Sequence, residues 1–421
     1  MIPEIRRAYN AAFTEERYES LLRGLDRDSG CPPGFRVAET PIFLPEDLTR
    51  ELVEGAHEIL AAVTSEEYLA LADRAVPPEL SVPGEEGHPV FLQVDFAIVR
   101  DEEGRLTPRL IELQGFPSLY GFQWLLEKEL NAHFPAIPEG FSPYFSGLDA
   151  ETYPAVLRDV IVGDCDPENV VLLEIDPEKQ KTRIDFCVTE RLTGIPTVNA
   201  RDVIERHGHL YYKVDRYEIP IQRIYNRVIF DELERKGIDL SHIFRRDLDV
   251  TWVGHPNWYL KISKFSLPFI RSRFCPPTWF VSNLEELPVD LDNYVLKPLF
   301  SFAGLGVEMG PSPERLRNLE DPENYILQKK VTYEPAVETL DEPARAEVRM
   351  MFVWKDGDRP RLVNNLVRLG KGKMMGVDFN KEKTWVGGSV AYHPPMPSPP
   401  RPSSPGPPPA HQGEEGGRQK S

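Results

Sequence analysis

Two apolar runs that follow one another in the sequence constrain the fold more than any other feature. Residues 90–100 read VFLQVDFAIVR, residues 107–114 read TPRLIELQ, and the acidic connector DEEGR lies between them. Such runs around a short, glycine-containing connector are typical of two antiparallel strands joined as a hairpin. Each run carries a carboxylate in its interior, Asp95 in the first and Glu112 in the second. Because a buried carboxylate is costly without a partner, this hairpin must provide one or border a site.

The polar residues of this hairpin could form a metal site. Glu112 and Gln114 are two residues apart and therefore share one face of their strand, and Asp95 lies across the hairpin. Three oxygen ligands could converge there, and Mg²⁺ prefers hard oxygen ligands while bridging carboxylates to phosphates. The bend that begins at Gly115 suits a strand that ends at a site. The alternative is an acidic pair on a solvated sheet face.

The segment 294–309, YVLKPLFSFAGLGVEM, has the composition of a phosphate-binding loop between two strands. The first strand ends at Lys297, and the loop contains Ser301, Gly304 and Gly306. Small residues let backbone N–H groups approach phosphate oxygens, and a lysine adds a point charge. The segment is neither a P-loop nor a dinucleotide-binding GxGxxG motif followed by a helix. The alternative is a glycine-rich hairpin turn with a half-buried lysine.

Two further strands carry residues suited to an anionic ligand. In YILQKKV, residues 325–331, Gln328 and Lys329 could lie beside an adenine base, although an edge strand protected by lysines has the same pattern. Arg349 and Arg368 each lie within an apolar strand, where a guanidinium can hold a carboxylate or phosphate with its planar fork. For Arg349 we favour a structural salt bridge.

Other chemistries receive less support. The HxH pair at 207–209 lies in a charged, loop-like stretch without a cysteine or carboxylate that could complete a metal site. A solvated loop is therefore favoured over a zinc site. The chain has no GxSxG or HExxH motif, which argues against hydrolases of those types. Its 49 basic and 67 acidic side chains give a net charge of −18, which disfavours wrapping nucleic acid.

Composition also bears on the compartment. No apolar run reaches the length of a transmembrane helix, and the first 20 residues lack the apolar stretch of a signal peptide. The four cysteines are far apart in sequence, form no CxxC pair, and are expected to be reduced thiols. We therefore predict a cytoplasmic protein without a membrane span.

The order of patterns divides the chain into five parts. Residues 14–25 and 48–63 have helical periodicity and belong to a helical region, 1–85. The hairpin part follows at 86–148, and at 149–255 short runs (VVLLEI, RIDFCV, LYYKV, PIQRIYNRVIF) predict the strands of an α/β layer. A second α/β unit, 256–392, follows, and a helix-like segment, 255–270, lies at its start. The end, 393–421, contains ten of the 41 prolines and predicts a disordered tail.

Taken together, these segments resemble ATP-grasp ligases. The hairpin, LQVDFAIV and LIELQGFPSL, is similar to the metal-binding hairpin of that family, and the closest likeness is to the synthetase domain of glutathionylspermidine synthase. Further likeness lies in HPNWYLKISKFSLPFI with Lys264, in YVLKPLFSFAGLGV, in YILQKK and in LVNNLVRLGKG with Arg368. The hairpin precedes the lysine strand by about two hundred residues, which is the circularly permuted order.

The resemblance implies an α/β fold of the ATP-grasp type and an ATP-dependent carboxylate–amine ligase that uses Mg²⁺. Asp95, Glu112 and Gln114 would hold the metal ion. The nucleotide would be bound by two phosphate-neutralising lysines, a closing loop and an adenine-side pair, namely Lys264, Lys297, Ser301, Gly304, Gly306, Gln328 and Lys329. Arg368 would stabilise the transferred phosphate. The expected partners are small carboxylates and amines, without nucleic acid or membrane, and the oligomeric state stays open.

Two departures from the family pattern motivate a rival hypothesis. The arginine that the family has two residues before the hairpin aspartate is Gln93, and the usual metal-site asparagine is Gln114. The first change removes an expected cation, whereas the second keeps an amide oxygen on a longer arm. The rival is a nucleotide-binding scaffold without ligase activity, and another phosphotransfer activity on the same fold also stays open.

Overall fold

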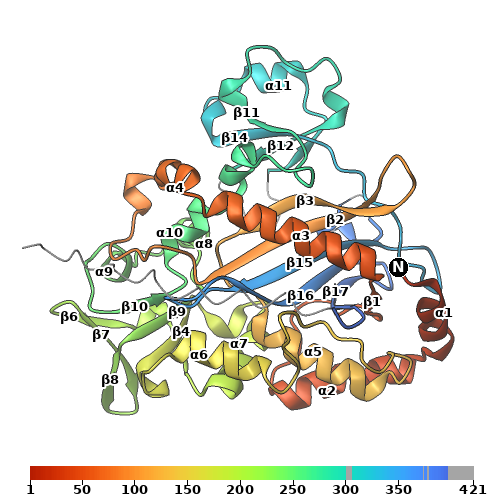
Figure 1. Ribbon diagram of the computed structural model, residues 1–421. Coiled ribbons are helices and arrows are strands. Elements are labelled where there is room, and N and C mark those ends of the chain that lie inside the picture. Colours follow the sequence, from red (N-terminus) through yellow and green to blue (C-terminus); the bar gives the residue numbers. More distant parts are fainter. Residues whose placement is uncertain (300–305, 373, 377–378, 397–421) are drawn as a thin grey trace, which may run out of the picture.

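The computed structural model describes residues 1–299, 306–372, 374–376 and 379–396 of the chain. Two antiparallel sheets and one parallel sheet form its main body, with helices on the outside (Figure 1). The helices are Pro3–Ala12 (α1), Glu15–Ser29 (α2), Glu46–Val63 (α3), Glu66–Ala72 (α4), Tyr120–His133 (α5), Tyr153–Val162 (α6), Arg183–Thr193 (α7), Phe230–Lys236 (α8), Ser241–Phe244 (α9), Pro256–Lys261 (α10) and Pro313–Arg317 (α11).

The strands are Ile42–Phe43 (β1), Phe91–Arg100 (β2), Leu106–Gln114 (β3), Val170–Glu174 (β4), Thr197–Asn199 (β5), Ile204–Arg206 (β6), His209–Val214 (β7), Tyr217–Ile221 (β8), Arg223–Asn226 (β9), Thr251–Val253 (β10), Thr278–Phe280 (β11), Tyr294–Pro298 (β12), Glu308–Met309 (β13), Tyr325–Lys329 (β14), Arg345–Val353 (β15), Arg361–Gly370 (β16), Gly387–Ser389 (β17) and Ala391–Tyr392 (β18).

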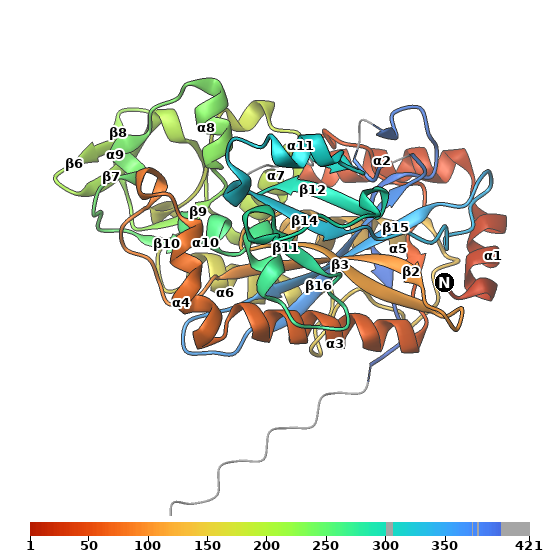
Figure 2. The same cartoon turned by 90° about the horizontal axis from the view of Figure 1, so that it is seen from above.

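The large antiparallel sheet contains the hairpin that the sequence predicts. Its order is β17-β16-β15-β2-β3, so β2 pairs with β3 on one side and with the distant β15 on the other. Helix α3 lies along one face of this sheet (Figure 2). Leu48, Leu52 and Ile59 recur at helical spacing and join Val94 and Val348 of the sheet in one buried cluster. Segments more than two hundred residues apart in sequence therefore share one core.

The small antiparallel sheet, β11-β14-β12-β13, lies beyond β3 together with α11 (Figure 1). It contains the strands that the sequence predicts around Lys297 and Gln328, which lie on one face of the sheet because Val295 pairs with Gln328 and Lys297 with Ile326. The predicted helix-like segment 255–270 comprises α10 and a 3₁₀ helix, Lys264–Phe269 (η6). This segment lies next to the start of the small sheet, since Phe265 and Phe280 pack ring against ring.

The parallel sheet, β10-β9-β4-β5, forms the centre of the predicted α/β layer. One prediction here is wrong, because RIDFCV is the first half of helix α7 and not a strand. Asp185 explains the difference. Its carboxylate is buried and accepts hydrogen bonds from the backbone N–H groups of Leu119 and Phe122 at the start of α5. That contact is made in the folded chain across more than sixty residues, so alternation in a six-residue run could not reveal it.

The N-terminal region is helical as predicted, but it is also tied to the far end of the chain. The predicted helix 14–25 extends to Ser29 and stops at Gly30, which has φ +76°. The helix predicted at 48–63 begins two residues earlier, after Pro45. Strand β1 then pairs in parallel with β18. Residues 1–85 therefore pack against the body as part of it.

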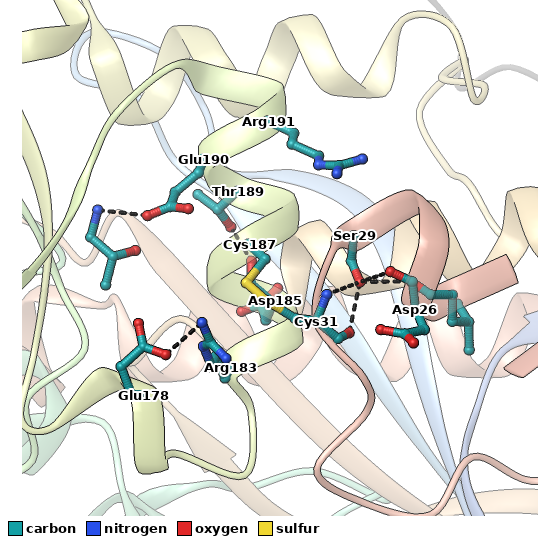
Figure 3. The surroundings of a disulfide bond; sticks show 12 residues. Asp26, Ser29, Cys31, Glu178, Arg183, Asp185, Cys187, Thr189, Glu190 and Arg191 are labelled. Atoms are coloured by element: carbon teal, nitrogen blue, oxygen red, sulfur yellow. Dashed lines mark hydrogen bonds and ion pairs between the residues drawn. A yellow bond between two sulfur atoms is a disulfide. The ribbon is translucent and has the colours of Figure 1, made fainter. Parts of the chain in front are cut away.

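A disulfide bond joins Cys31 to Cys187, which corrects the prediction of four reduced thiols (Figure 3). The two cysteines are 156 residues apart, and they meet because the segment after α2 lies against α7. Cys165 and Cys275 are free. Disulfides are typical of oxidising compartments, so this bond is unusual for the cytoplasmic location predicted above. No described helix combines the length and the apolar character that crossing a bilayer would require.

Candidate functional site

Lys297 connects the small sheet to the hairpin of the large sheet. Its ammonium donates to the side-chain oxygen of Gln328 at 2.6 Å and to the backbone oxygen of Ile111 on β3 at 3.1 Å. Gln328 in turn donates to Thr278 on β11 at 3.0 Å, which fixes its amide. Burial lowers the pKa of Lys297 to about 8. The structure thus brings together Lys297 and Gln328, as the sequence predicts, and holds the lysine beside β3.

Glu112 of β3 lies at the centre of a group of cations. Burial by itself would raise its pKa, but the charges of Arg368 and Lys264, followed by those of Arg349 and Lys297, outweigh burial and lower the pKa to about 2. Lys264 comes from η6, and burial lowers its pKa while the charge of Glu112 opposes that change. Four positively charged side chains from four separate elements therefore act on one carboxylate. At neutral pH Glu112 is ionised.

Asp95 is completely buried and is bound by two arginines. Arg349 on β15 donates from Nε to one carboxylate oxygen at 2.6 Å and from Nη2 to the other at 2.7 Å. Arg368 donates to the second oxygen as well. Gln93 accepts from Nη1 of Arg349 at 2.8 Å and donates to the backbone oxygen of Ser118 at 2.9 Å. The salt bridge that the sequence favours for Arg349 is confirmed.

Arg368 on β16 has a second acidic partner in Glu347, which lies opposite it on β15. Their ion pair spans 2.6 Å, and the distance from Arg368 to Glu112 is 3.6 Å. Tyr333 donates to the other oxygen of Glu347 at 2.7 Å. Burial raises the pKa of Glu347, and the charge of Arg368 partly offsets that rise. The side chain of Arg368 is 38% exposed, and its ion pairs with the three carboxylates are made by Nη2.

The predicted metal ligands do not converge on an open site. Both oxygens of Asp95 are occupied by guanidinium groups, and a side chain with 0% exposure offers nothing to an ion arriving from solvent. Gln114 donates to Glu112 at 3.1 Å, so those two residues do lie together. Within the described ranges, no group of three or more histidine, cysteine or acidic side chains could hold a metal ion. Asp95 therefore does not fit the magnesium role predicted for it.

The remaining predicted residues are placed as follows. Lys329, the last residue of β14, is exposed and pairs with Tyr294 at the edge of the site. Gly306 has φ +72°, and a Cβ there would lie 3.0 Å from the ring of Pro298, so glycine fits this position best. Ser301 and Gly304 lie outside the described residues. The HxH pair lies in an exposed turn as expected, since His207 and His209 are exposed and Nδ1 of His209 lies 3.3 Å from the carboxylate of Asp249.

Sequence reasoning missed Arg227, which follows β9 at the carboxyl end of the parallel sheet. Its guanidinium is 4% exposed and lies over the rings of Phe116, at 5.0 Å, and Phe186, at 5.5 Å. Its Nε and Nη1 atoms are buried without a hydrogen-bond partner. Ligands of open α/β sheets bind outside the carboxyl ends of the strands. An arginine just after a strand, in IYNRV, was the available signal, although on its own it is weak.

The sequence also contains a pattern that places Glu347 beside Arg349. Glu347 lies two residues before Arg349 in EVRMMFV, so alternation puts both on one face of β15. Asp95 is the partner of Arg349 in the register, and Arg368 is the partner of Glu347. Asp95 is therefore the oppositely charged neighbour of the buried Arg349, and Arg368 is that of the buried Glu347.

The chain has a structural relative but no match by sequence. No protein-family model and no curated protein matches it. A glutathione synthetase-like effector from Globodera pallida, solved in its apo form, is similar with a TM-score of 0.52 and 10% identity, over 90% of this chain and 97% of that chain. The chain thus shares the mixed α/β fold of that protein, while the ATP-grasp assignment, the permuted order and the likeness to glutathionylspermidine synthase stay predictions.

Proposed function

We propose that this protein binds ATP at the cationic cluster where β12 and η6 contact β3, in the manner of ATP-grasp proteins. One observation carries the proposal. Lys264, Lys297 and Arg368 come from three different elements and direct their charges at one point, Glu112. Such convergence on a surface of net negative charge is the arrangement that a small anionic ligand needs.

The charges around Glu112 suit the phosphates of a nucleotide. Four cationic side chains (Lys264, Lys297, Arg349 and Arg368) and three carboxylates (Asp95, Glu112 and Glu347) interact there. The base would then lie along β14, beside Gln328 and Lys329. The structural relative adds support, because it is a glutathione synthetase-like effector and glutathione synthetase belongs to the ATP-grasp superfamily.

The test is thermal unfolding of the full chain with and without ATP. A ligand that binds only the native state at ~100 times its dissociation constant adds about 2.7 kcal/mol. For roughly 390 folded residues the entropy of unfolding is about 0.8 kcal/mol/K, so the expected rise in Tm is about 3 °C. Lys297→Met should abolish the rise. Lys355→Met is the matched control, because Lys355 is an exposed lysine paired with Asp159. An unchanged Tm with saturating ATP would contradict the proposal.

A second candidate function, an ATP-dependent carboxylate–amine ligase, is favoured by Arg227. A buried guanidinium with two unpaired donor atoms is suited to hold the carboxylate of an acid substrate. The acid would attack the γ-phosphorus with ADP as the leaving group, and an amine would then displace phosphate from the acyl phosphate to give an amide. Lys264 and Lys297 would neutralise the phosphates during this transfer.

The ligase candidate also has space for an amine. A cavity of about 650 Å³ lies beside α8 and has Asp231 and Leu260 in its wall. Asp231 lies close enough to Lys264 for its charge to influence the lysine. The test is release of ADP with pools of acids and amines. Arg227→Gln should lower kcat/KM for the acid at least tenfold while the Tm shift with ATP persists. Absence of amide product with every pool would leave nucleotide binding as the function.

A further inference from the structure

We propose that the guanidinium of Arg368 supplies the positive charge that a metal ion would bring to this cluster, so that ATP binds without a divalent cation. The inference rests on the proposed nucleotide site and concerns the source of its positive charge. It predicts an ATP-binding protein that is insensitive to chelators.

The first support is the set of carboxylates that surround Arg368. Its Nη2 atom contacts Asp95, lies 2.6 Å from Glu347 and lies 3.6 Å from Glu112. Three carboxylates from three strands, β2, β15 and β3, therefore surround one cationic atom. Carboxylates attract a hard metal ion, but these three as positioned form no metal site, and the guanidinium supplies the positive charge that they need.

The second support is that the carboxylate of Asp95 has no accessible lone-pair position left for a metal ion. An ionised carboxylate offers about four lone-pair positions. Arg349 takes two of them with its fork, and Arg368 takes a third. The side chain is 0% exposed, so a hydrated ion cannot reach the fourth. Displacing Arg349 would leave its own charge buried and unpaired.

The third support is that Arg368 is positioned and still accessible. Register places it opposite Glu347, and Glu347 is itself held by the hydroxyl of Tyr333. With 38% of its side chain exposed, the guanidinium retains donors for a ligand. Its planar fork matches two phosphate oxygens, whereas a divalent ion placed at Glu112 would be repelled by Arg368 at short range.

The decisive experiment measures ATP binding to the full chain by calorimetric titration, once in EDTA and once with excess Mg²⁺. We expect the two dissociation constants to agree within about threefold. Binding that is at least tenfold tighter with Mg²⁺ would overturn the role of Arg368 while leaving the nucleotide site intact. No binding under either condition would overturn the nucleotide site and with it this inference.

A variant provides the reciprocal test. Arg368→Gln removes the charge and leaves Asp95, Glu112 and Glu347 without their shared cation. We expect ATP affinity in EDTA to fall at least about tenfold, the size of a lost charge-assisted bond. We also expect Mn²⁺, followed by electron paramagnetic resonance, to bind the variant but not the wild type.

Arg361→Gln, on the same strand, is the control and should behave as the wild type in both measurements, because Arg361 lies at the other end of β16 and donates to the backbone of Ser146. Mn²⁺ bound by the wild type with the affinity of the variant would contradict the inference. If Arg368→Gln does not fold, the comparison of EDTA with Mg²⁺ on the wild type decides by itself.

Discussion

Replacing Arg349 by methionine tests the central claim that a buried ion pair, and not a vacant metal site, holds the hairpin in the large sheet. Arg349 is 6% exposed and its partner Asp95 is 0% exposed. Removing one partner of a buried pair costs about 3–5 kcal/mol, because the other charge stays buried without compensation. Arg368 still contacts Asp95, so we expect the lower end, about 3 kcal/mol.

The expected change in Tm follows from the size of the chain. An entropy of unfolding of about 2.1 cal/mol/K per residue gives about 0.8 kcal/mol/K for roughly 390 residues. The loss of about 3 kcal/mol then corresponds to a fall in Tm of about 4 °C. Differential scanning calorimetry resolves a shift of this size. Arg361→Met is the control and should change Tm by less than about 1 °C, as is usual for surface substitutions.

The double variant separates the ion pair from packing. Asp95→Leu by itself leaves Arg349 unpaired and should cost about as much as Arg349→Met. When both are changed, no charge of the pair is left buried, and the combined loss should be at least about 2 kcal/mol smaller than the sum of the single losses. Losses that simply add would refute the reasoning, and so would an Arg349→Met variant as stable as the wild type.

Three further predictions concern other residues. Reducing the bond between Cys31 and Cys187 should lower the free energy of unfolding by up to about 5 kcal/mol, because the bond closes a loop of 156 residues. Thermal unfolding with and without dithiothreitol measures this loss, and Cys31→Ser should remove the effect of the reductant. The affinity for ATP should fall as pH rises above about 8, because Lys297 then loses its charge, and titrations of Lys297→Arg between pH 7 and about 9.5 should show no such fall. Burial raises the pKa of Glu174 to about 8, so between about pH 4.5 and 8 the folded state holds a proton that the unfolded state releases. This contribution to the free energy of unfolding is lost as pH rises through that range. A Glu174→Gln variant whose Tm has the same pH dependence as the wild type would contradict this.

Local patterns predicted the elements of the site well. The hairpin of β2 and β3 is confirmed within one residue at each end, because alternation and a short turn are properties of neighbouring residues. The strand that ends in Lys297 is confirmed for the same reason. Helix α3 is confirmed because its buried positions recur every three or four residues. The error at RIDFCV arose where a buried Asp185 serves another helix.

The sequence by itself determined that Asp95 needs a partner, because an ionised carboxylate within an apolar strand cannot stay alone in a core. Only the tertiary structure decided which partner it has. Arg349 is 254 residues away and Arg368 is 273 residues away, and β15 and β16 bring both to β2. A magnesium ion would have met the same local requirement equally well. The choice between a metal and a guanidinium depends on strand order and register, which arise from packing across the whole sheet and leave no trace in the residues around Asp95.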